Sequence, residues 1–200
     1  TINVTDAGTF ATLPGSYRLI NYTGTLTNST LDVGTTPGYG PGQAVVQAGI
    51  IPNQVNLIVS NGLNVAWWDG PDSTGGTGGI QGGNGTWNNT LANWTNELGT
   101  VNQTWLNGMA MFSAAAGTVT LGENVQAAAM QFMTSGYVVQ GGFSVQMNAL
   151  PDASAPFIRV DPGVTATVNA SLIGTNGLRK EDAGTLILGG GNTDSAATGV

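Results

Sequence analysis

The 200-residue sequence contains no cysteine and no histidine. These absences exclude disulfides, zinc–thiolate sites, iron–sulfur centres and cysteine nucleophiles from this chain, together with any Ser-His-Asp or Cys-His catalysis. Charged residues are also scarce, at 8% of the chain. Four Lys and Arg residues oppose eleven Asp and Glu residues, so the net charge is −7. A nucleic-acid or anionic-lipid partner is not expected, because no basic patch is available to bind one.

Long apolar runs are missing as well. No stretch approaches the roughly 18 apolar residues of a transmembrane helix. Residues 1–5, Thr-Ile-Asn-Val-Thr, have neither a basic nor an apolar signal-peptide region, so no signal peptide is expected here. Both ends of the sequence resemble cuts from a longer protein. The absence of cysteine is compatible with a bacterial extracellular protein.

The residues that are abundant indicate an all-β protein. Glycine (32) and proline (8) make one residue in five, while 40% of the chain is hydrophobic, enough for a packed core. Helical spacing of apolar residues is almost absent. Short runs of β-branched and apolar residues are instead bounded by Gly, Asn, Asp or Pro, as in Val55–Val59, Thr118–Leu121 and Thr185–Leu188.

The strand-like runs recur about every 20 residues in the C-terminal half. One series begins at Thr118, Tyr137, Phe157 and Leu178. A second begins at Val125, Phe143, Thr165 and Thr185. Two interleaved series with this step predict a solenoid, and short strands without helices favour a parallel β-helix. An antiparallel sandwich or jelly roll is the alternative, because it also has short strands and glycine-rich turns.

One region interrupts this pattern. All five tryptophans lie between residues 67 and 105, around a glycine-rich tract at residues 75–85. The sequence therefore predicts one continuous solenoid fragment in three parts. Residues 1–66 form β-helix coils, residues 67–110 form an elaborated coil or loop rich in Gly, Trp and Asn, and residues 111–200 form further coils.

The end of the chain resembles a known repeat. Residues 177–193 read Gly-Leu-Arg-Lys-Glu-Asp-Ala-Gly-Thr-Leu-Ile-Leu-Gly-Gly-Gly-Asn-Thr, which is similar to the autotransporter-associated β-strand repeat of type V secretion passengers. That repeat reads roughly G-L-x-K-x-G-x-G-T-L-x-L-x-G-x-N-T-Y. The sequence departs from it at Glu181-Asp182, where the family has Thr-Gly or Ser-Gly, and at Asp194, where the family has Tyr.

A second resemblance covers the middle of the chain. The segment found between such repeats reads W-D-G, G-T-W, N-W, A-x-F, G-T-V-T, L-x-F and G-Y in order. The matching positions are Trp68-Asp69-Gly70, Gly85-Thr86-Trp87, Asn93-Trp94, Phe112, Gly117-Thr118-Val119-Thr120, Phe132 and Gly136-Tyr137. Residues 17–26 also resemble a common passenger strand pair.

The resemblance implies a bacterial autotransporter passenger with a right-handed parallel β-helix. It implies display at the outer membrane and cell surface, on the extracellular side, or secretion. Membrane attachment is then expected only through a C-terminal outer-membrane barrel outside these 200 residues.

The tryptophans are the first candidate site. Trp87, Trp94 and Trp105 could form a low-affinity ligand contact, because aromatic faces stack on sugar rings. The same rings could instead plug the coil or pin the loop, and this packing role is the favoured interpretation because the positions are typical of the family.

Two acidic candidates follow. Asp69 and Asp72 could bind calcium, but the tandem aspartates of calcium β-rolls are missing, and capping of Asx turns is the preferred role. A polysaccharide-acting enzyme would need converging carboxylates. The available ones are Asp32, Asp152, Asp161, Glu181 and Asp182. Adjacent strand residues point to opposite faces, so Glu181 and Asp182 could not share one site.

The sequence thus predicts a surface adhesin or structural stalk in cell–host or cell–cell contact, with no catalytic residue, cofactor or metal. Its expected partner is a host-cell surface, the extracellular matrix or a glycan, and self-association is a further expectation. The alternatives are a β-helical polysaccharide-acting enzyme, or a spacer that displays an effector domain outside this fragment.

Overall fold

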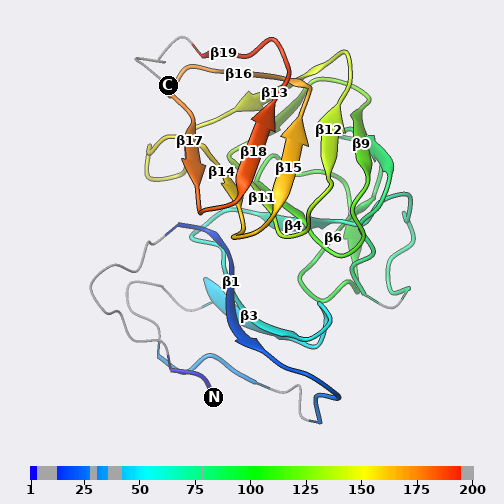
Figure 1. The fold of residues 1–200 in the computed structure, drawn as a ribbon, viewed down its shortest axis with the longest axis vertical. Helices are drawn as coiled ribbons and strands as arrows, with labels where there is room; N and C mark the ends of the chain where they lie inside the picture. Colours follow the sequence, from blue (N-terminus) through cyan, green and yellow to red (C-terminus); the bar gives the residue numbers. More distant parts are fainter. Residues whose placement is uncertain (4–12, 28–30, 36–41, 78, 195–200) are drawn as a thin grey trace. The chain divides into compact units, whose positions relative to one another are not determined.

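The structure is a computed structural model that describes residues 1–3, 13–27, 31–35, 42–77 and 79–194. Every regular element in these residues is a β-strand or a short bridge (Figure 1). The all-β class expected from the sequence is confirmed. No described segment is a helix that could cross a membrane. The chain divides into two compact units, Thr1–Leu63 and Asn64–Val200.

The first unit contains a three-stranded antiparallel sheet in the order β1-β3-β2. Its strands are β1 (Gly15–Asn21), β2 (Ala44–Ala48) and β3 (Gln54–Val59). The structure therefore differs from the β-helix coils expected over residues 1–66. The reason lies in the short connection between β2 and β3, where Gly49 and Asn53 adopt positive φ angles of 75° and 63°. A connection this short joins antiparallel neighbours, whereas parallel strands need a long crossover.

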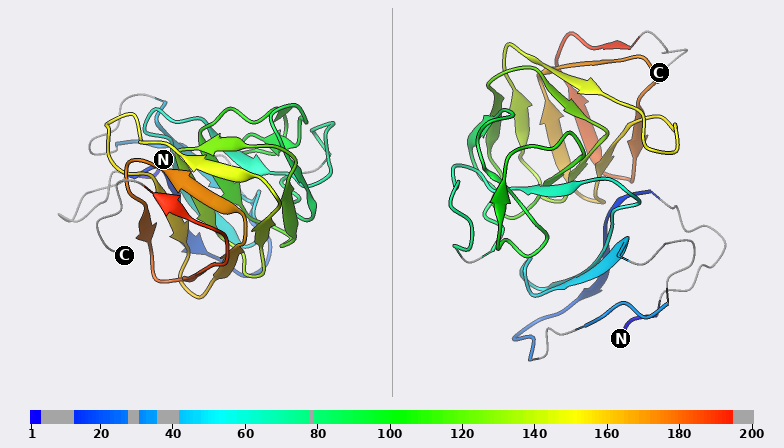
Figure 2. Two further views of the ribbon diagram at one scale, coloured as in Figure 1. Left: turned by 90° about the horizontal axis from the view of Figure 1, so that it is seen from above. Right: turned by 180° about the vertical axis from the view of Figure 1, so that it is seen from behind.

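The second unit contains three sheets that share its strands in rotation (Figures 1 and 2). The seven-stranded sheet has the order β17 (Arg179–Glu181), β14 (Phe157–Val160), β11 (Ala129–Phe132), β8 (Met109–Phe112), β4 (Val65–Trp68), β6 (Trp94–Thr95) and β7 (Asn102–Gln103). The five-stranded sheet has the order β18 (Thr185–Leu188), β15 (Thr165–Val168), β12 (Val138–Gln140), β9 (Thr118–Leu121) and β5 (Gly85–Trp87). The four-stranded sheet consists of β10 (Val125–Ala127), β13 (Ser144–Met147), β16 (Ser171–Gly174) and β19 (Thr193–Asp194).

From β8 onward, each strand pairs in parallel with the strand three positions later in the chain. Thus β8 pairs with β11, β9 with β12 and β10 with β13, and the same relation continues to β19. The connections are short, so consecutive strands pass from one sheet to the next rather than doubling back. The antiparallel sandwich considered from the sequence is not the arrangement of this unit.

The register corrects the spacing expected from the sequence. Thr118, Val138, Thr167 and Ile187 are partners on successive strands, with separations of 20, 29 and 20 residues. The long step contains residues 148–156, which separate β13 from β14, whereas Ala128 alone separates β10 from β11. Phe157 therefore does not continue the series that begins at Thr118 and Tyr137, because it belongs to a different sheet. A constant step near 20 concealed this insertion.

The core of the second unit comes from alternate residues of these strands. In β9, Val119 and Leu121 are buried in the core, while Thr120 between them is exposed. This alternation is what a strand with one buried face requires. Along the stack, Phe112 and Phe132 lie on neighbouring strands with parallel rings 4.7 Å apart and 10° between planes. The parallel register thus places like side chains above one another.

Candidate functional site: the tryptophan-rich excursion

The excursion (residues 67–110) adds non-repeating segments to one end of this strand stack. It contains β5, β6 and β7 together with the loops that join them. The strand β5 pairs in parallel with β9, whereas β6 and β7 extend the seven-stranded sheet by antiparallel pairing from β4. The excursion therefore lies at the edge of two sheets, where the regular parallel pairing stops.

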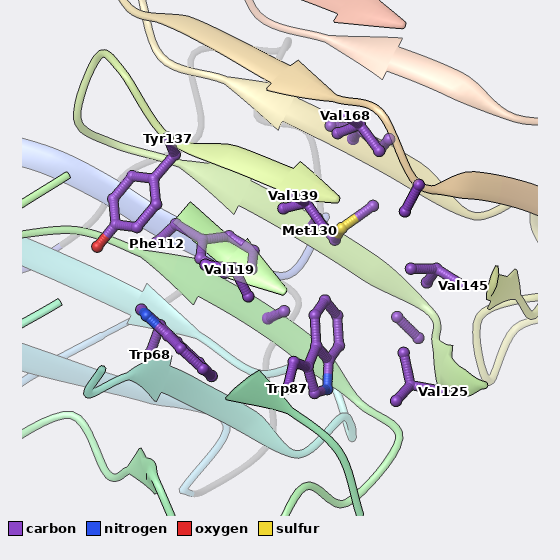
Figure 3. Close-up of a cluster of buried hydrophobic side chains, with 14 of the residues drawn as sticks. Trp68, Trp87, Phe112, Val119, Val125, Met130, Tyr137, Val139, Val145 and Val168 are labelled. Atoms are coloured by element: carbon purple, nitrogen blue, oxygen red, sulfur yellow. The ribbon is translucent and has the colours of Figure 1, made fainter. Parts of the chain in front are cut away.

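The tryptophan rings of the excursion pack against each other inside the core. Trp94 lies 5.1 Å from both Trp68 and Trp87, edge to face, and 4.5 Å from Trp105 between ring centroids. Trp87 meets Trp105 at 5.1 Å, and Phe112 at 6.0 Å. Edge-to-face contacts of this kind contribute roughly 0.5–1.5 kcal/mol each beyond the area they bury. Figure 3 shows Trp68 and Trp87 among the valine, methionine and phenylalanine side chains of the core.

This packing decides how the sugar-stacking hypothesis stands in the described conformation. Trp87 and Trp94 have no exposed surface and Trp105 is only 4% exposed. A stacking platform needs an open ring face, and none of these three residues has one. The arrangement instead has the geometry of the plug that the sequence analysis preferred.

Trp105 has a second role at a sheet edge. Its indole Nε1 donates a hydrogen bond of 2.6 Å to the main-chain oxygen of Gln126 in β10, an edge strand of the four-stranded sheet. The neighbouring Asn89 amide donates to the carboxylate of Glu123, at 2.6 Å. An unpaired strand edge attracts further strands. The excursion therefore covers this part of the edge with side-chain and loop contacts in place of another strand.

Asp69 ties three segments of the excursion together. Its carboxylate is fully buried and accepts hydrogen bonds from the main-chain amide of Gln81 at 2.7 Å and from the side-chain amide of Asn102 at 3.1 Å. Asn93 adds a second link, because its side-chain amide donates to the main-chain oxygens of Gly70 and Thr86. Buried polar groups must be hydrogen-bonded, so these contacts fix the loop path.

Asp72 has the turn-capping role expected from the sequence. Its carboxylate accepts from the main-chain amide of Thr74 at 2.9 Å, the pattern of an Asx turn, and also from the hydroxyls of Thr74 and Thr77. Hydrogen bonding from Thr77, and then from Thr74, lowers the pKa of Asp72. Among the described residues, no group of three or more acidic side chains gathers in a way that could hold a metal ion.

The other candidate carboxylates have structural partners. Asp182 lies 3.3 Å from the Arg159 side chain and Glu181 lies 3.4 Å from Arg179. Asp161 accepts a hydrogen bond from the Gln131 side chain at 2.8 Å, and Asp152 caps a turn through the amide of Ser154 at 3.0 Å. Hydrogen bonding from Ser154 lowers the pKa of Asp152.

Asp32 lies in the first unit, where its main-chain oxygen accepts from Ile2 at 2.7 Å. It is thus not in the same unit as the other four carboxylates.

Sequence reasoning did not find the roles of Asp69, Asn93 and Trp105 as linkers. A signal for one of these contacts is present in the glycines. Gly70 adopts a φ of +60°, and a Cβ there would lie 2.0 Å from the main-chain oxygen of Gly82. Close backbone approach of this kind accounts for glycine on both sides of the loop, but the sequence does not say which segments approach.

Comparison with known proteins gives one informative relationship. The chain is 37% identical over 204 aligned residues, 92% of its own length, to the protein named "Adhesin BmaC autotransporter" from Brucella suis biovar 1 (strain 1330). The aligned part is 6% of that protein's length. No family model matches the chain. No solved structure matches it either.

The alignment covers the excursion and the C-terminal repeat, the two segments that carry the resemblance seen in the sequence. It supports display on the bacterial cell surface, at the outer membrane. The chain is an autotransporter passenger region.

Proposed function

We propose that this region is an adhesive surface module of a much longer passenger, acting in cell–host or cell–cell contact. The single observation that carries the proposal is its identity of 37% to a protein named as an adhesin. Because the chain corresponds to only 6% of that protein, the adhesive role of this particular segment is a hypothesis about the segment.

The proposal includes the architecture. The three sheets of the second unit close around one core and wind as a right-handed β-helix, as in the resembling passengers. Support comes from the rotation of strands β8 to β19 through the three sheets and from the shared core cluster. Winding of this kind presents the outward side chains of each sheet as regular columns, which suits a binding surface or a rigid stalk.

A deletion separates the adhesin from a spacer. Residues 64–194 would be removed from the intact surface protein, and in a second variant they would be replaced by an equal number of coils from elsewhere in the same passenger. The adhesin proposal predicts that both variants are displayed but lose adherence to host cells. Restored adherence in the replacement variant would assign the segment a spacer role. Unchanged adherence in both would contradict the proposal.

A further inference from the structure

The outward face of the five-stranded sheet differs from the excursion in how its threonines are used. Six threonines point outward from β5, β9, β15 and β18, because their strand neighbours lie in the core. They are Thr86, Thr118, Thr120, Thr165, Thr167 and Thr185. Four of them are exposed, and Thr118 and Thr167 are half-buried.

These threonines stand in register. Thr86 is the partner of Thr120, which is the partner of Gln140 on the next strand. Thr165 is likewise the partner of Thr185. Neighbouring strands of a sheet are about 4.8 Å apart, so hydroxyl groups recur at that interval along each column. Threonine is stiff at χ1, so little rotamer freedom is lost when such a column binds a partner.

The hydroxyls of this face are not used inside the protein. Within the described residues, none of the six donates or accepts a side-chain hydrogen bond. In the excursion the opposite holds, since the hydroxyls of Thr74, Thr77, Thr90, Thr95 and Thr100 all have internal partners. The loop threonines therefore serve the fold, whereas the threonines of the sheet face have their hydrogen-bonding capacity available for a partner.

The face is also uncharged. No Asp, Glu, Lys or Arg belongs to its described columns, whose other members are Gln140, Val138 and Ile187. The basic residues of the second unit lie elsewhere and are engaged. Arg159 pairs with Asp182, Arg179 pairs with Glu181, and the Lys180 ammonium donates to the main-chain oxygen of Asp182. A sulfated or sialylated glycan would thus meet a net negative chain without a cation to bind it.

A protein partner fits this face poorly. The core of a protein–protein interface is apolar and rich in aromatic residues, whereas this face has only Val138 and Ile187 among hydroxyl and amide groups. A neutral polysaccharide also presents repeated hydroxyl groups and carries no charge that would require a counterion.

From these observations we infer that the outward face of the five-stranded sheet binds neutral polysaccharide along its threonine columns. This inference rests on the proposed adhesive function and names its ligand class. Each contact is weak, and binding strength comes from repetition along the column.

Affinity electrophoresis of the 200-residue chain tests the inference. Native gels would contain soluble β-1,3-glucan or mannan as neutral probes, and heparin as the anionic probe. The test variant combines Thr118→Val, Thr120→Val and Thr167→Val, which preserves side-chain shape, strand preference and net charge while removing three hydroxyls. The matched control is Gln146→Val, at an exposed position on the outward face of the four-stranded sheet.

We expect retardation by at least one neutral probe, with about a tenfold or larger loss of apparent affinity in the triple variant, because three hydrogen bonds are lost. The Gln146→Val control should retain wild-type retardation. Binding by the triple variant equal to wild type overturns the assignment of the face. Retardation by heparin alone, or by no probe, overturns the ligand class. Concentration-dependent dimerisation that the triple variant abolishes would identify a second copy as the occupant instead.

Adherence of the intact surface protein carrying the same three substitutions separates the two proposals. Loss of adherence together with loss of glycan binding supports both. If the deletion of residues 64–194 abolishes adherence while the triple variant adheres normally, the glycan inference fails and the adhesive function stands. If even the deletion leaves adherence intact, the adhesive function fails whatever the gels show.

Discussion

The indole Nε1 of Trp105 donates a 2.6 Å hydrogen bond to the main-chain oxygen of Gln126, on the edge strand β10. Three residues of β10 are paired on one side only, with β13. The tryptophan thus supplies one donor where a further strand would otherwise supply a ladder of them. It also connects the tryptophan cluster to the first residues of the regular parallel array.

Replacement of Trp105 by Phe tests this contact. Phe keeps an aromatic ring in the cluster but leaves the Gln126 oxygen without its donor, so we expect a destabilisation of about 1–3 kcal/mol beyond the loss of ring area. The matched control is Trp87→Phe, because the indole Nε1 of Trp87 is buried without a partner. Denaturant unfolding followed by tryptophan fluorescence compares the two. An equal loss of stability in both variants would show that the hydrogen bond contributes nothing.

Tryptophan fluorescence also tests the burial of the cluster. All five tryptophans lie in the second unit and none is more than 4% exposed. We expect blue-shifted emission, weak quenching by acrylamide in the folded chain and strong quenching after unfolding. Titration with a neutral polysaccharide should leave the emission spectrum unchanged, because the threonine face contains no tryptophan. A large spectral shift on sugar addition would return the rings to the role of a binding platform.

Two glycines of the excursion form a matched pair. Gly70 and Gly83 both have positive φ angles, of +60° and +88°, but a Cβ at Gly70 would lie 2.0 Å from the Gly82 oxygen, whereas a Cβ at Gly83 would meet nothing within 4 Å. Gly83→Ala should therefore cost only backbone strain, about 1 kcal/mol. Gly70→Ala should cost clearly more, because the main chain must move. Thermal unfolding of the two variants measures the difference, and similar midpoints would contradict the close approach.

The carboxylate of Asp72 should make the loop sensitive to acid. Its pKa is lowered from 3.8 by hydrogen bonds from Thr77 and Thr74, so the folded state favours the charged form. The stabilisation is fully present above pH 3.8, the unfolded value, and is lost as the pH falls through the lower folded value. An NMR titration should show the Thr74 amide shifting with the Asp72 carboxyl below pH 3.8. In Asp72→Asn this low-pH transition of the Thr74 amide should be absent, and its persistence would assign the transition to another group.

Much of the second unit could be predicted because its signals are local. Alternation of apolar and polar residues marks strands such as β9 and β15, and a step of 20 residues marks three of the registered strand pairs that follow Thr118 and Val125. The insertion at residues 148–156 was hidden because apolar residues such as Phe157 also occur about 20 residues after strands of a different sheet. Pairing partners are a long-range property, which a count of residues does not determine.

The first unit and the excursion were harder for a related reason. Strands β1 to β3 have the same short β-branched character as the later coils, and the direction of pairing depends on the turn at Gly49 and Asn53 rather than on strand composition. In the excursion, the sequence identified the tryptophans as a unit and Asp72 as a turn cap. It did not identify Asp69 as a buried link, because a carboxylate beside glycine has the same appearance in an exposed loop.

Engineered cysteine pairs test the parallel register most directly, because the chain contains no native cysteine. Thr120 and Gln140 are partners on β9 and β12, and Gln126 and Gln146 are partners on β10 and β13. The account predicts that Thr120→Cys with Gln140→Cys, and Gln126→Cys with Gln146→Cys, form intramolecular disulfides under mild oxidation, because partners across a sheet lie within disulfide reach. The crossed pair Thr120→Cys with Gln146→Cys should remain reduced. Efficient disulfide formation in the crossed pair, with none in the two registered pairs, would contradict the three-sheet parallel arrangement.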